Sequence, residues 1–117
     1  MPFNDAMAAH IIWKLRLANY VAGASTEAFD SATVRRDDQC ELGKWIHGEA
    51  AKFQSVPAYE DLLRKHADFH ICAAEIIGKM EHGDKNGAAV ILGGPFEAAS
   101  RGIIGALVAL RNTGVAA

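Results

Sequence analysis

The sequence predicts an all-α protein: an antiparallel four-helix bundle with an additional short helix, about five helices in all. Three observations indicate this fold class. Alanine is abundant, and leucine, lysine, glutamate and arginine are common, all residues with high helix propensity. Strict alternation of apolar and polar residues, which is typical of strands, is hard to find. The stretches between the helical segments are short, which favours antiparallel neighbours.

The first helix is expected from about Asn4 to Gly23, with Asn4 or Asp5 as its N-cap. Lys14 falls on the main apolar stripe of this helix and is expected at its edge, where its ammonium group can reach water. His10 falls on the same stripe, where an apolar residue is expected. The other members of the stripe are Phe3, Met7, Leu17 and Val21, with Ile11, Leu15 and Ala18 flanking it.

The segment from Gly23 to Thr33 is expected to be a loop, with a helical turn around Thr26 to Asp30. Asp37 can cap a second helix from about Asp38 to His47, which ends before Gly48. Cys40 lies in the first turn of this helix. Gly43 is unusual there, because glycine costs about 1 kcal/mol relative to alanine in a helix. We expect it to permit the close approach of another helix or of a site.

A long third helix is expected from about Val56 to His82, opened by Ser55 and Pro57 and ended by Gly83. Its apolar face includes two histidines at positions where core residues are expected. The central stripe consists of Leu62, His66, Phe69, Ala73, Ile76 and Met80, and Tyr59, Leu63, His70 and Ile77 lie alongside it.

The last third of the chain is expected to contain two helices. Asp84 can cap the first, from Lys85 to Leu92, and Gly93-Gly94-Pro95 interrupts the pattern. The final helix is expected from Phe96 to Arg111, with Ile103, Leu107 and Leu110 on its apolar side. No internal repeat or second domain is visible, so residues 1–117 are expected to form a single domain.

Charge and composition exclude several classes of function. Lysine and arginine total 12 and aspartate and glutamate total 14, so the chain lacks the basic excess expected for binding nucleic acid or an anionic membrane. The longest apolar run, Gly102 to Leu110, is about half the roughly 20 residues that a membrane span needs. The segment after Met1 lacks the basic start of a signal peptide, and two cysteines are too few for a disulfide scaffold. We therefore expect a cytoplasmic protein.

The clearest chemical signal is the pair His66-x-x-x-His70. Residues four apart on a helix lie on one face about 6 Å apart, so their imidazoles can meet one metal ion. The pair alone is a weak signal. The alternative interpretation is that one histidine faces the core and the other is solvated.

His10 and Cys40 strengthen the metal interpretation. Three imidazole nitrogens and one thiolate form a tetrahedral set that suits zinc, whereas the thiolate disfavours magnesium and calcium, and the lack of carboxylate partners disfavours a di-iron site. The remaining candidates fit less well. His47 is about 10 Å along the helix axis from Cys40, His82 is expected at the surface, and Cys72 should face away from the site. Spacing alone also allows Cys40 to be a buried thiol with no role.

Taken together, four ordered motifs resemble the chemoreceptor zinc-binding (CZB) domain family. They are His10-Ile-Ile-Trp13-Lys14, Asp38-Gln-Cys40-Glu-Leu42-Gly43-Lys44-Trp45-Ile46-x-Gly48, Pro57-x-Tyr59 and His66-x-x-x-His70. The resemblance implies a bacterial helical-bundle domain that binds one Zn²⁺ through three histidines and one cysteine. Carried over by motif position, the ligands would be His10, Cys40, His66 and His70.

The resemblance also offers roles for neighbouring residues. Trp13 and Trp45 could wall the site, although ordinary core packing is the preferred interpretation. Asp37 and Asp38 could orient a ligand imidazole, although helix capping is preferred for Asp37.

Family members usually sit inside chemoreceptors or diguanylate cyclases, which implies a chemotaxis or cyclic-di-GMP signalling partner and allows a homodimer. Our leading hypothesis is a regulatory domain that responds to zinc level or to oxidation of Cys40, for example by hypochlorous acid. Four protein ligands leave no open position on zinc, which argues against an enzyme. The alternatives are a metal-free helical interaction module and, less favoured, a small zinc hydrolase.

Overall fold

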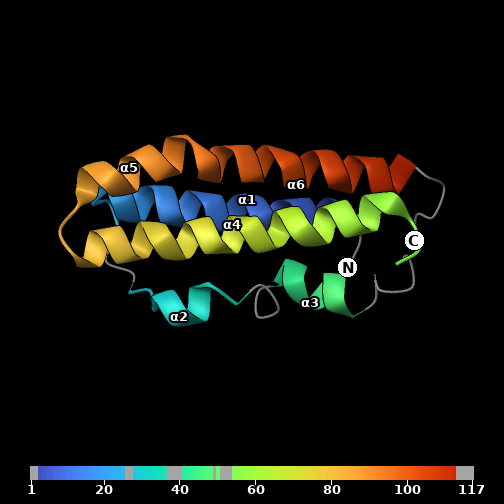
Figure 1. Cartoon of the computed structure of the whole chain (residues 1–117), viewed down its shortest axis with the longest axis horizontal. Helices are drawn as coiled ribbons and strands as arrows, with labels where there is room; N and C mark the ends of the chain where they lie inside the picture. Colours follow the sequence, from blue (N-terminus) through green and yellow to red (C-terminus); the bar gives the residue numbers. More distant parts are fainter. Residues whose placement is uncertain (1–2, 26–27, 37–40, 49, 51–53, 113–117) are drawn as a thin grey trace.

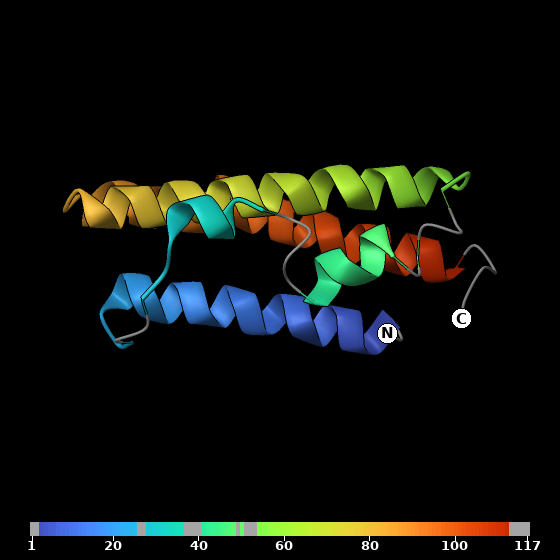
Figure 2. The ribbon, with the colours of Figure 1, turned by 90° about the horizontal axis from the view of Figure 1, so that it is seen from below.

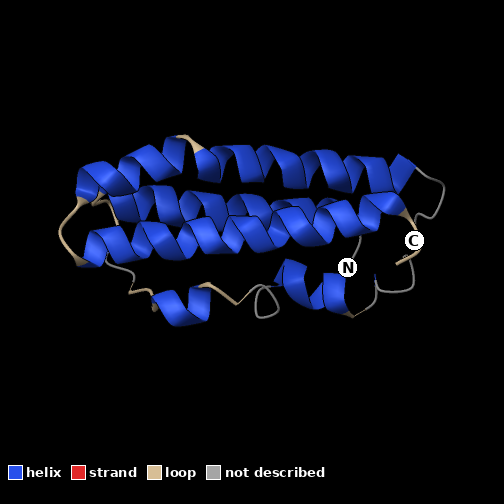
Figure 3. Cartoon of the chain, viewed as in Figure 1, coloured by secondary structure: helices blue, strands red, loops and turns tan. Residues whose placement is uncertain are grey.

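The computed structural model describes residues 3–25, 28–36, 41–48, 50 and 54–112. Its helices are α1 (Phe3–Ala22), α2 (Ser31–Val34), α3 (Glu41–His47), α4 (Pro57–Glu81), α5 (Lys85–Gly93) and α6 (Pro95–Asn112). The described residues contain helices and loops but no strand (Figure 3). The predicted all-α fold class is confirmed.

The helices form an up-down-up-down bundle, 46 × 22 × 20 Å in extent. Figure 1 shows α1 and α4 running in one direction, while α5 and α6 lie end to end and return along them. The short helices α2 and α3 follow one another along a further side of the bundle. In Figure 2 they lie between α1 and α4, in agreement with the contacts of α2 with α4 and of α3 with α1. The predicted four-helix bundle therefore has two continuous helices and two interrupted ones.

Most helix ends lie where the sequence predicts them. Gly23 and Gly83 follow α1 and α4 with φ of 78° and 74°, the left-handed conformation that glycine adopts without strain. Pro57 stands in the first turn of α4, and the carboxylate of Asp84 accepts a hydrogen bond of 2.9 Å from the Gly87 amide at the start of α5. A break at Gly94 separates α5 from α6.

One turn begins later than expected. The helical turn predicted around Thr26 to Asp30 is α2, which starts at Ser31. Asp30 precedes it as a cap: its carbonyl accepts from the Val34 amide at 2.9 Å and its carboxylate from the Thr33 hydroxyl at 2.7 Å. The helix predicted from Asp38 begins at Glu41 in the described part of the chain. Asp37, Asp38 and Cys40 lie outside the described residues.

The core forms where the apolar stripes of α1, α4 and α6 meet. Phe69 of α4 and Phe96 of α6 stack with ring centroids 4.6 Å apart. Leu62, Phe69, Ala73 and Ile76 of the predicted α4 stripe are buried, as are Ile103, Leu107 and Leu110 of α6. Ile11 and Leu15, which flank the α1 stripe, are 45% and 58% exposed. They lie more than a quarter turn from the inward face of α1, since successive helical residues differ by about 100°.

Candidate metal centre

Two histidines meet on the buried face of α4. His66 and His70 are 1% and 2% exposed, and their Nε2 atoms lie 3.2 Å apart. The i,i+4 spacing within a continuous helix places the two rings together, with centroids 4.6 Å apart. The structure therefore brings together the pair that the sequence singled out.

The backbone of α2 orients His70. Nδ1 of His70 lies 2.8 Å from the carbonyl oxygen of Val34. Because a carbonyl only accepts, Nδ1 carries the proton, and in the neutral imidazole Nε2 is left with its lone pair. An N–H bound to a carbonyl is the usual arrangement behind a metal-ligating histidine. Val34 could not be identified from the sequence, since the acceptor is a main-chain atom that any residue type would supply.

Trp13 of α1 stands beside this pair. The centroids of the Trp13 and His70 rings lie 5.8 Å apart in an edge-on arrangement, and the guanidinium of Arg16 lies 4.5 Å from the centroid of the Trp13 ring. Trp13 is half-buried and packs against the core, so it both fills space and walls the histidine pair. Trp45, by contrast, is 5% exposed and is part of the core, as the preferred interpretation predicted.

His10 enters the same cluster from α1. It is 2% exposed and its ring lies 4.5 Å from that of Phe69, which also contacts His70. Nε2 of His10 lies 2.8 Å from the hydroxyl oxygen of Ser100 in α6. Nδ1 is buried and has no hydrogen-bond partner in the described part of the chain. Lys14, one turn along α1, lies at the edge of the stripe as predicted and pairs with Glu97 at 2.8 Å.

Burial keeps the imidazoles of His10 and His66 neutral. Burial, followed by the charges of Lys14 and His70, lowers the pKa of His10 to about 4. Burial, followed by the charges of His70, His10 and His47, lowers the pKa of His66 to about 3. Neutral imidazole is the form that binds metal ions.

The geometry of the α4 pair fits a zinc ion. Two nitrogens at the usual Zn–N distance of about 2.0–2.1 Å and the tetrahedral angle would lie about 3.3 Å apart. The observed 3.2 Å between the two Nε2 atoms agrees with this value. Within the described ranges, no three histidine, cysteine, aspartate or glutamate side chains converge enough to hold a metal ion by themselves. Cys40, the remaining donor that the sequence predicts, lies outside these ranges.

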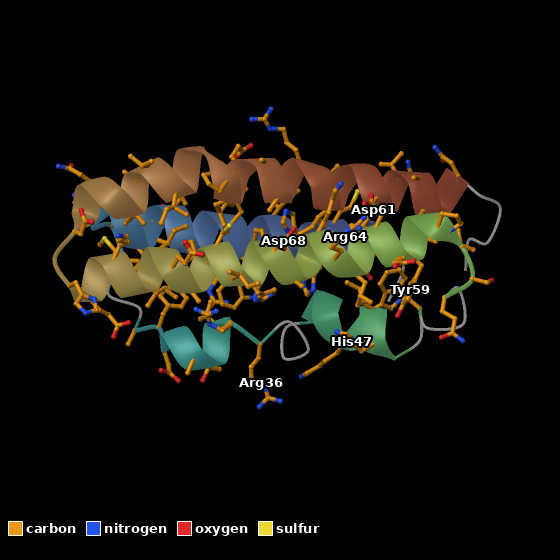
Figure 4. The ribbon with its side chains drawn as sticks, in the orientation of Figure 1. Arg36, His47, Tyr59, Asp61, Arg64 and Asp68 are labelled. Carbon is orange, nitrogen blue, oxygen red and sulfur yellow. The ribbon has the colours of Figure 1, made fainter. Side chains whose placement is uncertain are left out.

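The remaining candidates lie elsewhere. His47 is on the exposed side of α3, next to the point where Tyr59 reaches across from α4 (Figure 4). The Tyr59 hydroxyl donates to the Ile46 carbonyl at 2.9 Å and so ties α3 to α4. His82 is exposed, as predicted, with Nδ1 2.7 Å from the Gly78 carbonyl. Cys72 is half-buried at a groove between α4 and α6, and burial followed by the charges of Glu75 and Asp68 raises the pKa of its thiol.

Comparison with known proteins agrees with these features. The family model described as the chemoreceptor zinc-binding domain matches residues 10–77, more than half of the chain. The match begins at His10 and extends through His66 and His70 to residue 77, close to the C-terminal end of α4; α5 and α6 lie beyond it. No curated protein and no solved structure matches the chain. No helix in the described residues is long and apolar enough to span a membrane.

Proposed function

Because the chain belongs to the chemoreceptor zinc-binding domain family, we propose that it is a regulatory domain whose zinc ion is held by four side chains. Zinc is the cofactor of this domain. The proposed ligands are His10, Cys40, His66 and His70.

The observation that carries this proposal is the His66–His70 pair. Two buried imidazoles with Nε2 atoms 3.2 Å apart, one of them oriented through its Nδ1 by the Val34 carbonyl, would supply two of the four ligands of a tetrahedral site. Both rings lie inside a packed core, so neither histidine is solvated, whereas the alternative interpretation of the pair leaves one of them in water. This arrangement favours zinc over a metal-free interaction module.

The donor set indicates a structural and regulatory ion. A zinc ion bound by three imidazoles and a thiolate supplies a link between helices, and it keeps no position for a substrate or a reactive water. Of this chain's residues, His70 is oriented by α2, His10 is anchored to α6, and Cys40 precedes α3 in the sequence. We therefore propose a non-enzymatic role, in contrast to a zinc hydrolase, which needs an open coordination position.

Two inputs would alter this link. In the first, the zinc level sets occupancy, and the free energy of metal binding adds to the stability of the bundle. In the second, hypochlorous acid oxidises the Cys40 thiolate to sulfenic acid and is itself reduced to chloride, which removes the anionic ligand. Either input would let a helix rearrange and act on a chemotaxis or cyclic-di-GMP signalling partner in the cytoplasm.

Metal content of the purified, untagged protein tests the site. Elemental mass spectrometry should find about one zinc per chain, as expected of a closed site. The Cys40→Ala variant should lose zinc, whereas Cys72→Ala removes the other cysteine and serves as the matched control that retains it. Equal zinc binding by both variants would exclude Cys40, and a folded protein that takes up no zinc would leave the interaction module.

Oxidation separates the two inputs. One equivalent of hypochlorous acid should release zinc to a chromophoric chelator from the unmodified chain and from Cys72→Ala alike. Zinc that stays bound after Cys40 has been oxidised, as seen by mass spectrometry, would contradict the oxidant input and leave zinc level as the signal.

A further inference from the structure

A buried serine of α6 contacts the predicted zinc ligand of α1. Ser100 is fully buried, and its hydroxyl oxygen lies 2.8 Å from Nε2 of His10. The two residues are 90 positions apart, and Ser100 lies outside the region matched by the family model. Ser100 is thus a polar side chain in an apolar layer, one helical turn from the buried Phe96, and its hydroxyl contacts a predicted ligand.

We propose that Ser100 is the positioning residue for His10: it accepts the Nε2 proton, so that Nδ1 presents its lone pair to zinc. The proposal rests on the proposed function, in which His10 is a ligand.

The hydrogen-bonding inventory of His10 supports this assignment. A neutral imidazole carries one proton, so one ring nitrogen donates and the other keeps a lone pair. Nε2 has the Ser100 oxygen as acceptor, whereas Nδ1 is buried and has no hydrogen-bond partner in the residues described. A proton on Nδ1 would be buried without an acceptor, which costs roughly 1–3 kcal/mol. A lone pair on Nδ1 directed at a cation carries no such penalty.

The assignment makes His10 different from His70. The Nε2 atoms of His66 and His70 face one another, and Nδ1 of His70 donates a hydrogen bond to the Val34 carbonyl. His10 has its anchored nitrogen at Nε2 instead. The zinc-bound protein should therefore contain ligand imidazoles of both tautomers.

A second contact fixes the same pair of helices. Lys14 lies four residues after His10, and Glu97 lies three residues before Ser100, so both pairs join neighbouring turns of α1 and α6. The Lys14 ammonium is 2.8 Å and 3.0 Å from the two carboxylate oxygens of Glu97. This ion pair holds the register in which Ser100 faces His10. The α6 helix thereby takes part in the site without supplying a metal ligand.

Zinc affinity of the full chain tests the role of Ser100. In a competition with a chelator, Ser100→Ala should bind zinc about 10- to 100-fold more weakly, the usual effect of removing a hydrogen bond behind a ligating histidine. Tyr59→Phe is the matched control, since it also removes one buried hydroxyl, but one that donates to the Ile46 carbonyl and not to a predicted ligand. Its affinity should stay within about threefold of the unmodified chain, well below the loss expected for Ser100→Ala. Ser100→Thr keeps the hydroxyl and should restore most of the affinity.

NMR of the unmodified chain gives an independent readout, even where a variant folds poorly. Long-range ¹H–¹⁵N spectra of the zinc-loaded, ¹⁵N-labelled protein should show His10 protonated at Nε2 and His70 protonated at Nδ1. Coordination of His10 through Nε2, or unchanged zinc affinity in folded Ser100→Ala, would overturn the proposal. A His10→Ala variant that retains full zinc affinity would instead contradict the ligand set itself, so the two failures are distinguishable.

Discussion

Acid is expected to destabilise the zinc-free protein at a pH where most of its carboxylates are still ionised. The effect is expected as the pH decreases through the range in which the histidines of the unfolded chain become protonated. Burial lowers the pKa of His10 to about 4 and that of His66 to about 3, from an ordinary value of 6.5. Both histidines lie in the core, so their protonated forms belong to the unfolded chain.

The sign and size follow from proton linkage. Below pH 6.5 the unfolded chain binds two protons that the folded chain excludes, so the free energy of unfolding falls as the pH falls. At pH 5 each histidine lowers it by about 2 kcal/mol relative to pH 8, and the two together by about 4 kcal/mol. A typical domain has roughly 5–15 kcal/mol in total, so this loss is a large share.

Urea unfolding in excess chelator, followed by circular dichroism from about pH 8 to about pH 5, measures this effect. His66→Leu removes one of the two groups and should roughly halve the decline. His82→Gln removes an exposed imidazole and should keep the full decline. A free energy of unfolding that stays constant over this range, or a decline that His66→Leu leaves unchanged, would show that the folded chain does not exclude protons from these two histidines.

Two further predictions concern the packing that supports the site. Phe96 is fully buried and stacks on Phe69, so Phe96→Ala should lower the free energy of unfolding by about 3–5 kcal/mol in urea denaturation; a loss under about 1 kcal/mol would contradict its central place. The Lys14–Glu97 pair is partly exposed, and a double-mutant cycle should give a coupling of about 0.2–1 kcal/mol that high salt weakens. Lys14 lowers the pKa of Glu97, so this coupling should disappear as acid protonates the carboxylate; a coupling that survives in acid would contradict an ionic origin.

The helices could be predicted from the sequence because their signals are local. The stripe on α4, the glycines after α1 and α4, and the Asp84 cap are all set by residues within a few positions of each other. The start of α2 was predicted too early. Asp30, Ser31 and Thr33 are all good capping or turn residues, and only the packed structure selects Asp30 as the cap.

The candidate site could be predicted in part, for the same reason. The spacing of His66 and His70 within one helix predicts that their rings meet, and the structure confirms it. The interruption of an apolar stripe identified His10 as unusual, but its partner Ser100 is 90 residues away and could not be found from local patterns. The Val34 carbonyl carries no signal in residue type at all. The contribution of Cys40 stays a prediction.

The side of the bundle formed by α2 and α3 is where a change in zinc binding should act first. These helices have four and seven residues, too short to be stable alone in water. Side chains of α4 hold both, through the His70 bond to Val34 and the Tyr59 bond to Ile46. Cys40 lies between the two helices in the sequence, so a zinc ion bound there and to α4 would add a third link on the same side.

Hydrogen exchange should be measured with zinc bound and after zinc has been removed. Removal of zinc should reduce the protection of the amides in α3, while the amides around Phe69 in α4 stay protected. An equal loss in both places would contradict a change confined to this side and would mean that zinc stabilises the bundle as a whole.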